Sequence, residues 1–411
     1  MQRTIVVRLR PAPEQAEILR ATLEQYTACF NEVAREGFTT GCKNGVELHH
    51  RTYALLRARY PALPAPLVCS ARVKATEAVT SALTWNRRRE QAHAEAVKRA
   101  ALQGKAPPAF RPVRCPQSRL TSLRYDQRSY WVTWAEDGRG MCSLSTVAGR
   151  LLLPFRVLPH QAPFQSGKVC TADLCFRRGR WSLHIVVLLP DPVVTPSPEV
   201  IGVDVGLTHP AVTSSRRFLG EKRWKEQDRR IFRLRRALQA KGTRSAKRHL
   251  KRLRGKRFRL HRDHDHVLSK RLVEQAPAGS TLVLENLTHI RETSRLGRGP
   301  GKRTEAKRRL HSWSFAQLFS FIEYKAQAKG IRVVRIDPRH TSQTCSRCGF
   351  QHRGNRRTPA EFHCRACGYR LHADLNAAYT IRDRYLTCLA QEGTALLSGP
   401  TCQAASRVPS S

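Results

Sequence analysis

Acidic residues are scarce in this chain. Its 411 residues include 74 Lys+Arg but only 31 Asp+Glu, which gives a formal net charge of +43 at pH 7. So strong a positive field is unusual for an enzyme that acts on small molecules. It favours a polyanionic partner, because basic side chains displace the counterions that condense on phosphate backbones. High solubility alone, or binding to an anionic membrane, would also be compatible with this charge, but the composition favours a nucleic-acid-binding protein.

Long hydrophobic runs are missing too. The sequence has no stretch of about 18 uncharged apolar residues, which argues against a membrane span. Arg3, Arg8 and Arg10 interrupt the start of the chain, so it has no continuous apolar core of a signal peptide. The 13 cysteines are odd in number, and apart from one group of four they are scattered, which argues against a disulfide framework. We therefore expect a cytoplasmic protein that is not secreted.

The first half of the chain changes character near residues 104–108. Before that point apolar residues recur every three or four positions, which predicts a helical bundle over 12–104. After it, short runs rich in aromatic and β-branched residues predict strands, with a hairpin turn at 177–180. We predict a small β-barrel or curled sheet built from 1–11 and 105–190.

A Pro-rich linker over 191–199 precedes an α/β pattern. Short apolar runs predict strands, and longer amphipathic stretches predict helices, of which two are strongly basic. The strands are expected at about 200–205, 281–284 and 331–336, and the helices at about 222–254, 257–275, 314–329 and 374–383. We expect the segment 387–411, which has little periodicity, to be disordered.

Four cysteines form the strongest local pattern. Cys345 and Cys348 are separated by two residues, as are Cys364 and Cys367, and a glycine follows each pair. Two intervening residues let both sulfurs of a pair face one ion, and the glycine permits the tight turn that directs backbone amides at them. Four thiolates at about 2.3 Å close a tetrahedral zinc site with no open position. The spacing predicts one structural Zn²⁺, with free thiols or local disulfides as the alternative.

Because acids are few, their positions are informative. Asp204 and Glu285 each end an apolar strand, and Asp374 lies at the expected start of a helix just beyond the cysteines. Two strand ends and a helix start can converge at one edge of a sheet, where carboxylates would bind a pair of Mg²⁺ ions for phosphodiester chemistry. Alternatively, Asp374 caps its helix, and Asp204 and Glu285 pair with arginines.

The order of these motifs resembles that of the TnpB family, the transposon-encoded ancestor of the type V CRISPR effectors. The resemblance covers about 200–386 and rests on segments read directly from the sequence: Ile201-Gly-Val-Asp-Val-Gly206, Leu284-Glu-Asn-Leu287, the two cysteine pairs and His372-Ala-Asp-Leu-Asn-Ala-Ala378. It implies an α/β RNase H-like (RuvC-like) nuclease domain over 200–340 and 369–386, with a zinc ribbon inserted at 341–368. It also implies that the helical bundle is a recognition lobe and that the β-rich part is a wedge domain.

The resemblance further implies an RNA-guided DNA endonuclease, bound to a guide RNA and to double-stranded target DNA with a short adjacent motif, and found at the nucleoid. Asp204, Glu285 and Asp374 would be its catalytic residues and the ligands of two Mg²⁺ ions. A compact type V CRISPR effector shares every one of these motifs. A non-cleaving RNA-guided repressor would be expected to have lost an acid, and a transposase would need a strand-transfer constellation that we do not find.

Basic residues concentrate in two stretches. Residues 221–260 hold 18 Lys+Arg and three acids, and residues 291–309 hold eight Lys+Arg and two Glu. A net charge of +15 within forty residues repels itself unless a polyanion is present, so we expect nucleic-acid contacts here. The candidate contact residues are Lys222, Arg223, Lys225, Arg229, Arg230, Arg248, Lys251, Arg252, Lys256, Arg257, Lys302 and Arg303.

Overall fold

The computed structural model of the chain describes residues 1–288, 290, 310–358 and 360–395. The chain divides into two compact units, Met1–Pro190 and Asp191–Ser411, so the division falls where the Pro-rich segment begins. Each unit is described below by itself. Among the residues that the structure describes, no helix has the length and apolarity needed to cross a bilayer.

The first unit contains two antiparallel sheets. One has the order β1 (Gln2–Leu9), β7 (Arg180–Leu188), β6 (Lys168–Arg177) and β2 (Leu123–Tyr125), and the other joins β3 (Tyr130–Trp134), β4 (Arg139–Thr146) and β5 (Gly149–Arg156). β1 pairs with β7 along its whole length, from Gln2↔Leu188 to Leu9↔Trp181. Alternate residues of both strands are buried, as expected for a sheet with one face on a core.

Three helices lie between β1 and β2 in the sequence, namely α1 (Pro13–Thr40), α2 (Gly45–Arg59) and α3 (Ala65–Leu102). Gly41 ends α1 in the left-handed conformation, with φ 69°, and the Asn44 side chain caps the start of α2. The buried stripe of α1, which includes Leu23 and Tyr26, belongs to the same hydrophobic cluster as the inward residues of β1 and β7. The helices and the strands of this unit therefore share one core.

The second unit is built on a five-stranded mixed sheet. Its order is β10 (Phe218–Leu219), β9 (Ala211–Thr213), β8 (Val200–Asp204), β11 (Thr281–Glu285) and β12 (Arg332–Ile336). β8, β11 and β12 run parallel, whereas β9 and β10 are antiparallel to their neighbours. The described part of this unit includes the helices α4 (Lys222–Lys241), α5 (Arg244–Gln275), α8 (Phe315–Ala328) and α9 (Ala373–Ala395).

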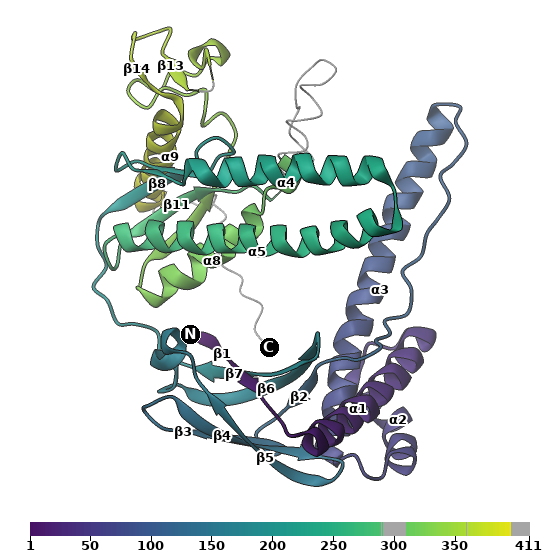
Figure 1. Ribbon diagram of the computed structural model, residues 1–411. Helices are drawn as coiled ribbons and strands as arrows, with labels where there is room; N and C mark the ends of the chain where they lie inside the picture. Colours follow the sequence, from purple (N-terminus) through teal and green to yellow (C-terminus); the bar gives the residue numbers. More distant parts are fainter. Residues whose placement is uncertain (289, 291–309, 359, 396–411) are drawn as a thin grey trace. The chain divides into compact units, whose positions relative to one another are not determined.

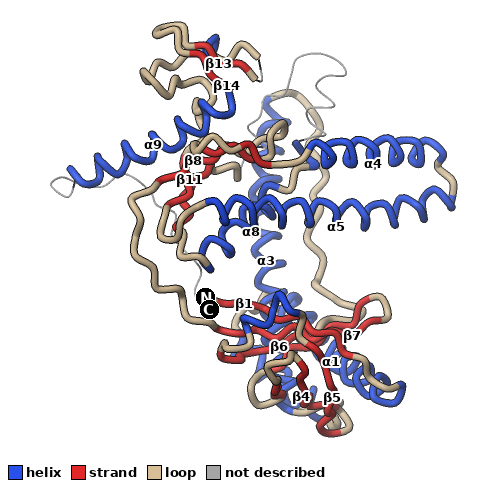
Figure 2. Tube along the Cα trace, turned by 60° about the vertical axis from the view of Figure 1, so that its left-hand side comes forward, coloured by secondary structure: helices blue, strands red, loops and turns tan. Residues whose placement is uncertain are grey.

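Helices cover both faces of this sheet. Figures 1 and 2 show α9 on one face and α5 and α8 on the other. Leu282 and Leu284 of β11 pack into the cluster that includes α5 and α8, whereas Val283 between them packs against Ile381 and Tyr385 of α9. This alternation follows from the two-residue period of a strand. It assigns Glu285, two residues after Val283, to the face that α9 covers.

Close packing of α9 on β8 depends on a glycine. A Cβ at Gly202 would lie 2.1 Å from the Ala378 backbone oxygen and 2.7 Å from the Arg382 backbone nitrogen. Only a residue without a side chain permits this approach. Because Asp204 lies two residues after Gly202, it also belongs to the face of the sheet on which α9 lies.

Two predictions about helix ends were wrong. We placed the break between the basic helices at 254–257, but Gly255 lies inside α5 and the break is at Gly242. Gly242 has φ 64°, and the Thr243 hydroxyl accepts a hydrogen bond from the Ala246 amide, so a left-handed stop is followed directly by a cap. The segment expected to be disordered from 387 is helical as far as Ala395, because contacts of Ile381 and Tyr385 with the sheet hold α9 in place. Residues 396–411 lie outside the described residues.

Candidate metal-binding sites

Asp204 and Glu285 lie next to each other at one edge of the sheet. They are the last residues of the parallel neighbours β8 and β11, and Val203 pairs with Leu284 immediately before them. Asp374 lies in the first turn of α9, on the face where both strand carboxylates emerge. The structure therefore brings together the three acids singled out in the sequence, although they are far apart along the chain.

The electrostatics of this group are those of buried, mutually repelling acids. Burial raises the pKa of Asp204 well above its usual range, and the charges of Glu285 and Asp374 raise it further. Burial also raises the pKa of Glu285, which is 9% exposed, while a hydrogen bond from the Thr341 hydroxyl opposes that shift. Clustered carboxylates of this kind are stabilised by a divalent cation, so the residues present fit a Mg²⁺ site.

Each oxygen of Asp374 has a partner that we did not predict. His209 Nδ1 lies 2.8 Å from Oδ2, and the Arg356 guanidinium donates to Oδ1 at 2.9 Å. His209 lies in the loop after β8, and Arg356 follows the short 3₁₀ helix η2 (Arg353–Asn355). No spacing in the sequence connects either residue with Asp374. His209 meets Asp374 only when α9 packs on β8, and Arg356 meets it through the fold of the segment around β13, where it pairs with Phe362.

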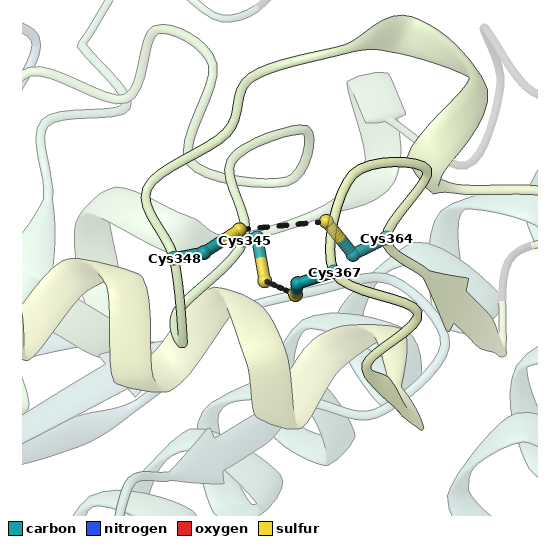
Figure 3. A group of neighbouring side chains, drawn as sticks. All are labelled: Cys345, Cys348, Cys364 and Cys367. Atoms are coloured by element: carbon teal, nitrogen blue, oxygen red, sulfur yellow. Dashed lines mark hydrogen bonds between the residues drawn. The ribbon is translucent and has the colours of Figure 1, made fainter.

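The four cysteines form a compact cluster, shown in Figure 3. Their Sγ atoms lie 3.8 Å apart between Cys345 and Cys367 and 3.6 Å apart between Cys348 and Cys364. Four thiolates at about 2.3 Å from one ion in tetrahedral geometry are separated by about 3.8 Å, so the cluster has the dimensions of a zinc site.

The two turns that carry these cysteines are alike. Gly349 and Gly368 have φ of 74° and 68°, and each donates its amide to the carbonyl of the first cysteine of its pair. Burial opposes ionisation of Cys364, but hydrogen bonds from the Cys367 and Ala366 amides lower its pKa to about 7. The backbone amides thus favour the thiolate at Cys364, whereas burial raises the pKa of the Cys345 thiol to about 12.

The cysteine cluster is joined to the start of α9. The buried Asn376 side chain donates to the Thr344 carbonyl at 2.8 Å and accepts from the Ser346 amide at 3.0 Å. The hairpin of β13 (Glu361–His363) and β14 (Arg370–His372) leads directly into α9. The cluster and Asp374 are consequently held in one local framework.

Helices α4 and α5 carry ten of the twelve basic residues proposed for nucleic-acid contact. Eight of these ten are exposed, and Lys225 and Arg257 are half-buried. Arg223 forms an ion pair with Glu221, and Arg257 forms one with Asp228. Lys302 and Arg303 lie outside the described residues.

Comparison with known proteins connects this arrangement to a family. The family model of the Cas12f1-like TNB domain matches residues 315–381. The CRISPR-associated endodeoxyribonuclease Cas12f1 of Sulfoacidibacillus thermotolerans is 32% identical over 253 residues, which are 57% of this chain and 56% of the relative. The TnpB-like protein MJ0751 of Methanocaldococcus jannaschii is 38% identical over 96 residues, 23% of this chain and 33% of the relative. The chain is thus similar to TnpB-like proteins and to Cas12f1 nucleases.

A further protein to which the chain is similar is the putative RNA-guided DNA endonuclease InsQ of Escherichia coli. It is 27% identical over 245 residues, 54% of this chain and 60% of the relative. The chain thus matches little more than half the length of Cas12f1 and InsQ. A cryo-EM structure of a Cas12f1–sgRNA–target DNA complex aligns with 90% of this chain and 83% of the Cas12f1 chain, with a TM-score of 0.62 and 15% identity. That likeness shows that the chain shares the fold of the Cas12f1 chain.

Proposed function

We propose that this protein is an RNA-guided DNA endonuclease that hydrolyses phosphodiester bonds with magnesium. The observation that carries the proposal is the meeting of Asp204, Glu285 and Asp374 at one edge of the sheet, on the face that α9 covers. The mutual repulsion of these buried carboxylates is a cost to the fold, and bound cations would remove it.

The residues around the carboxylates prepare them for metal binding. Thr341 holds Glu285 through its hydroxyl, and His209 and Arg356 hold the two oxygens of Asp374. The side chains are thus oriented before any ion arrives, which lowers the entropic cost of assembling the site. Two Mg²⁺ ions bound here would activate a water molecule and stabilise the leaving 3′-oxygen of the cut strand.

We assign one structural Zn²⁺ to Cys345, Cys348, Cys364 and Cys367. Sulfur spacings of 3.6 Å and 3.8 Å support this assignment. Since four thiolates fill the coordination shell, the ion would take no part in the chemistry. Its role would be to hold the framework that positions Asp374 and Arg356.

The proposed partners are a guide RNA and a double-stranded DNA target with a short adjacent motif. The exposed basic face of α4 and α5 supports binding of a polyanion, and the names of InsQ and the Cas12f1 complex point to RNA guidance. In such systems base pairing provides most of the sequence specificity, while the protein recognises backbone shape and charge. Within Met1–Pro190 we assign α1–α3 to a recognition lobe and the strands to a wedge domain.

A compact CRISPR effector is the second candidate, favoured by the 32% identity to Cas12f1. Sequencing the RNA that copurifies with the protein separates the two, because a CRISPR effector would carry repeat-derived RNA and a transposon protein would carry RNA from its own element. A non-cleaving repressor is disfavoured by the presence of all three carboxylates, and a transposase by the lack of a strand-transfer constellation.

Alanine variants of the three acids test the proposal. Asp204→Ala, Glu285→Ala and Asp374→Ala should each abolish DNA cleavage and leave target binding intact, since binding is spread over many basic residues. Cleavage and gel-shift assays run on the same RNA-loaded preparations would measure both properties. Asp383→Ala is the matched control, because Asp383 lies on α9 but bonds to Arg382. Cleavage by Asp374→Ala at the wild-type rate would contradict the assignment.

A further inference from the structure

Two histidines and Asp374 form a group that the proposed magnesium chemistry does not use. His209 comes from the loop after β8, His372 ends β14, and Asp374 begins α9. One potential ligand atom from each of the three lies within 4.8 Å of the other two. Apart from the four cysteines, this is the only such group of His, Cys, Asp or Glu found among the described residues.

Both imidazole rings are held by packing. Phe218 on β10 packs against both rings in T-shaped geometry, with centroids 5.3 Å from His209 and 5.0 Å from His372, and the two histidine centroids lie 5.2 Å apart. The Asp374 amide donates to Nδ1 of His372 at 3.3 Å. The three side chains are thus arranged without a ligand, and the 34% exposure of His209 leaves a route from solvent.

We propose that His209, His372 and Asp374 bind a divalent transition-metal ion such as Ni²⁺ or Zn²⁺. Two imidazole nitrogens and one carboxylate oxygen suit these ions, whereas Mg²⁺ prefers oxygen ligands. His209 Nδ1 and Asp374 Oδ2 are 2.8 Å apart, close to the roughly 3 Å between neighbouring ligands of an ion bound at about 2.1 Å. Without the ion, the Nδ1–H of a neutral His209 donates to Asp374 Oδ2. On binding, this hydrogen bond is broken and the imidazole proton is carried on Nε2 instead, so that the Nδ1 lone pair binds the ion with no net release of a proton.

The site uses a different oxygen of Asp374 from the one that Arg356 holds. Arg356 donates to Oδ1, and the two histidines lie on the side of Oδ2. The transition-metal ion can therefore bind without displacing Arg356. The bound transition-metal ion does, however, occupy Oδ2 of Asp374, and this oxygen is then no longer available to Mg²⁺. If the proposed nuclease function is right, Ni²⁺ bound here lowers magnesium-dependent cleavage.

Calorimetric titration with Ni²⁺ tests binding independently of cleavage. The sample is the full chain without a polyhistidine tag, with its cysteine cluster saturated with zinc. We expect one site in the wild type, weakened at least tenfold by His209→Asn and by His372→Asn, while the exposed His160→Ala serves as the matched control and binds as the wild type does. Unchanged affinity in both asparagine variants would overturn the proposal.

A second measurement needs no variant and so does not depend on how the variants fold. X-ray absorption at the nickel edge of the wild-type chain, loaded with one equivalent of Ni²⁺, should show scattering from two imidazoles. Scattering from one imidazole or from none would refute the site.

A third measurement separates this inference from the nuclease proposal. If the protein binds nickel but shows no magnesium-dependent cleavage, the nickel site is supported and the nuclease proposal is refuted. If the protein cleaves DNA and Ni²⁺ inhibits the wild type and His209→Asn equally, the nickel site is refuted.

Discussion

Replacing Gly202 with alanine should separate the two elements that bring the carboxylates together. Gly202 lies where α9 crosses β8, and the added methyl carbon would be 2.1 Å from the Ala378 carbonyl oxygen and 2.9 Å from the Arg382 Cβ. The first of these neighbours is backbone, so no rotamer change relieves the clash. The helix or the strand must move.

The size of the effect follows from that distance. An ordinary contact is about 3.5 Å, so α9 and β8 must separate locally by about 1.4 Å. Overpacking of this kind costs about 1–3 kcal/mol, which in a unit of this size lowers the melting temperature by about 2–12 °C. Asp374 at the start of α9 moves away from Asp204, and a misplacement of about 1 Å lowers catalysis about 100-fold.

Melting curves and single-turnover cleavage of the RNA-loaded protein would measure both effects. Gly206→Ala is the matched control from the same segment, because its methyl carbon would come no closer than 3.2 Å to the His209 carbonyl oxygen. We expect the control to lose less than half as much stability as Gly202→Ala. The reasoning is refuted if Gly202→Ala melts within about 1 °C of the wild type and cleaves at the same rate.

Three further predictions concern the metal, one buried acid and the nucleic acid. Cys364→Ser should reduce the zinc content below one per chain and lower cleavage, and metal analysis showing unchanged zinc would contradict the assignment of the ion to the four cysteines. Burial raises the pKa of Asp265 to about 6, so the folded protein keeps a proton that the unfolded chain releases near pH 4. Stability is therefore lost as the pH rises from about 4 to 6, by at most about 3 kcal/mol. Asp265→Asn should raise the melting temperature at pH 7.5 and flatten its dependence on pH, and a lower melting temperature there would count against this account. The purified protein should contain RNA, and removing this RNA with nuclease and high salt should lower the melting temperature. The reason is that a ligand present at 100 times its dissociation constant adds about 2.7 kcal/mol to the free energy of unfolding. An RNA-free sample that is equally stable and still cuts one chosen DNA site would refute RNA guidance.

Local sequence patterns predicted the elements that carry the site. The apolar runs of β8 and β11 are short and uninterrupted, as in parallel strands covered on both faces, and the acid at the end of each run marks the edge of the sheet. The cysteine spacing predicted the cluster because both turns are local structures of about five residues. Patterns that extend over only about five residues along the chain can be recognised without knowing the fold.

Contacts between distant segments could not be read in this way. His209 meets Asp374 across 165 positions, and neither residue type nor spacing indicates the pairing. The local sequence gives little indication of β4, because Gly140, Ser143 and Ser145 weaken its strand pattern. The strand is stabilised by pairing with β3 and β5 on either side. The break between α4 and α5 was misplaced for a similar reason. Positions 242 and 255 are both glycine, and only the capping residue at position 243 marks the first of them as the end of a helix.

The position of Asp374 in α9 also matters for the order in which the protein is made. Asp204 and Glu285 emerge from the ribosome first, and Asp374 follows Glu285 by 89 positions. At about 5–20 residues per second, the third carboxylate follows the second by roughly 5–20 s. During that interval the nascent chain already carries the basic helices α4 and α5, but the proposed set of three metal-binding carboxylates is incomplete. Under the proposed function, translation would therefore give a guide RNA time to bind before the chain could cut DNA.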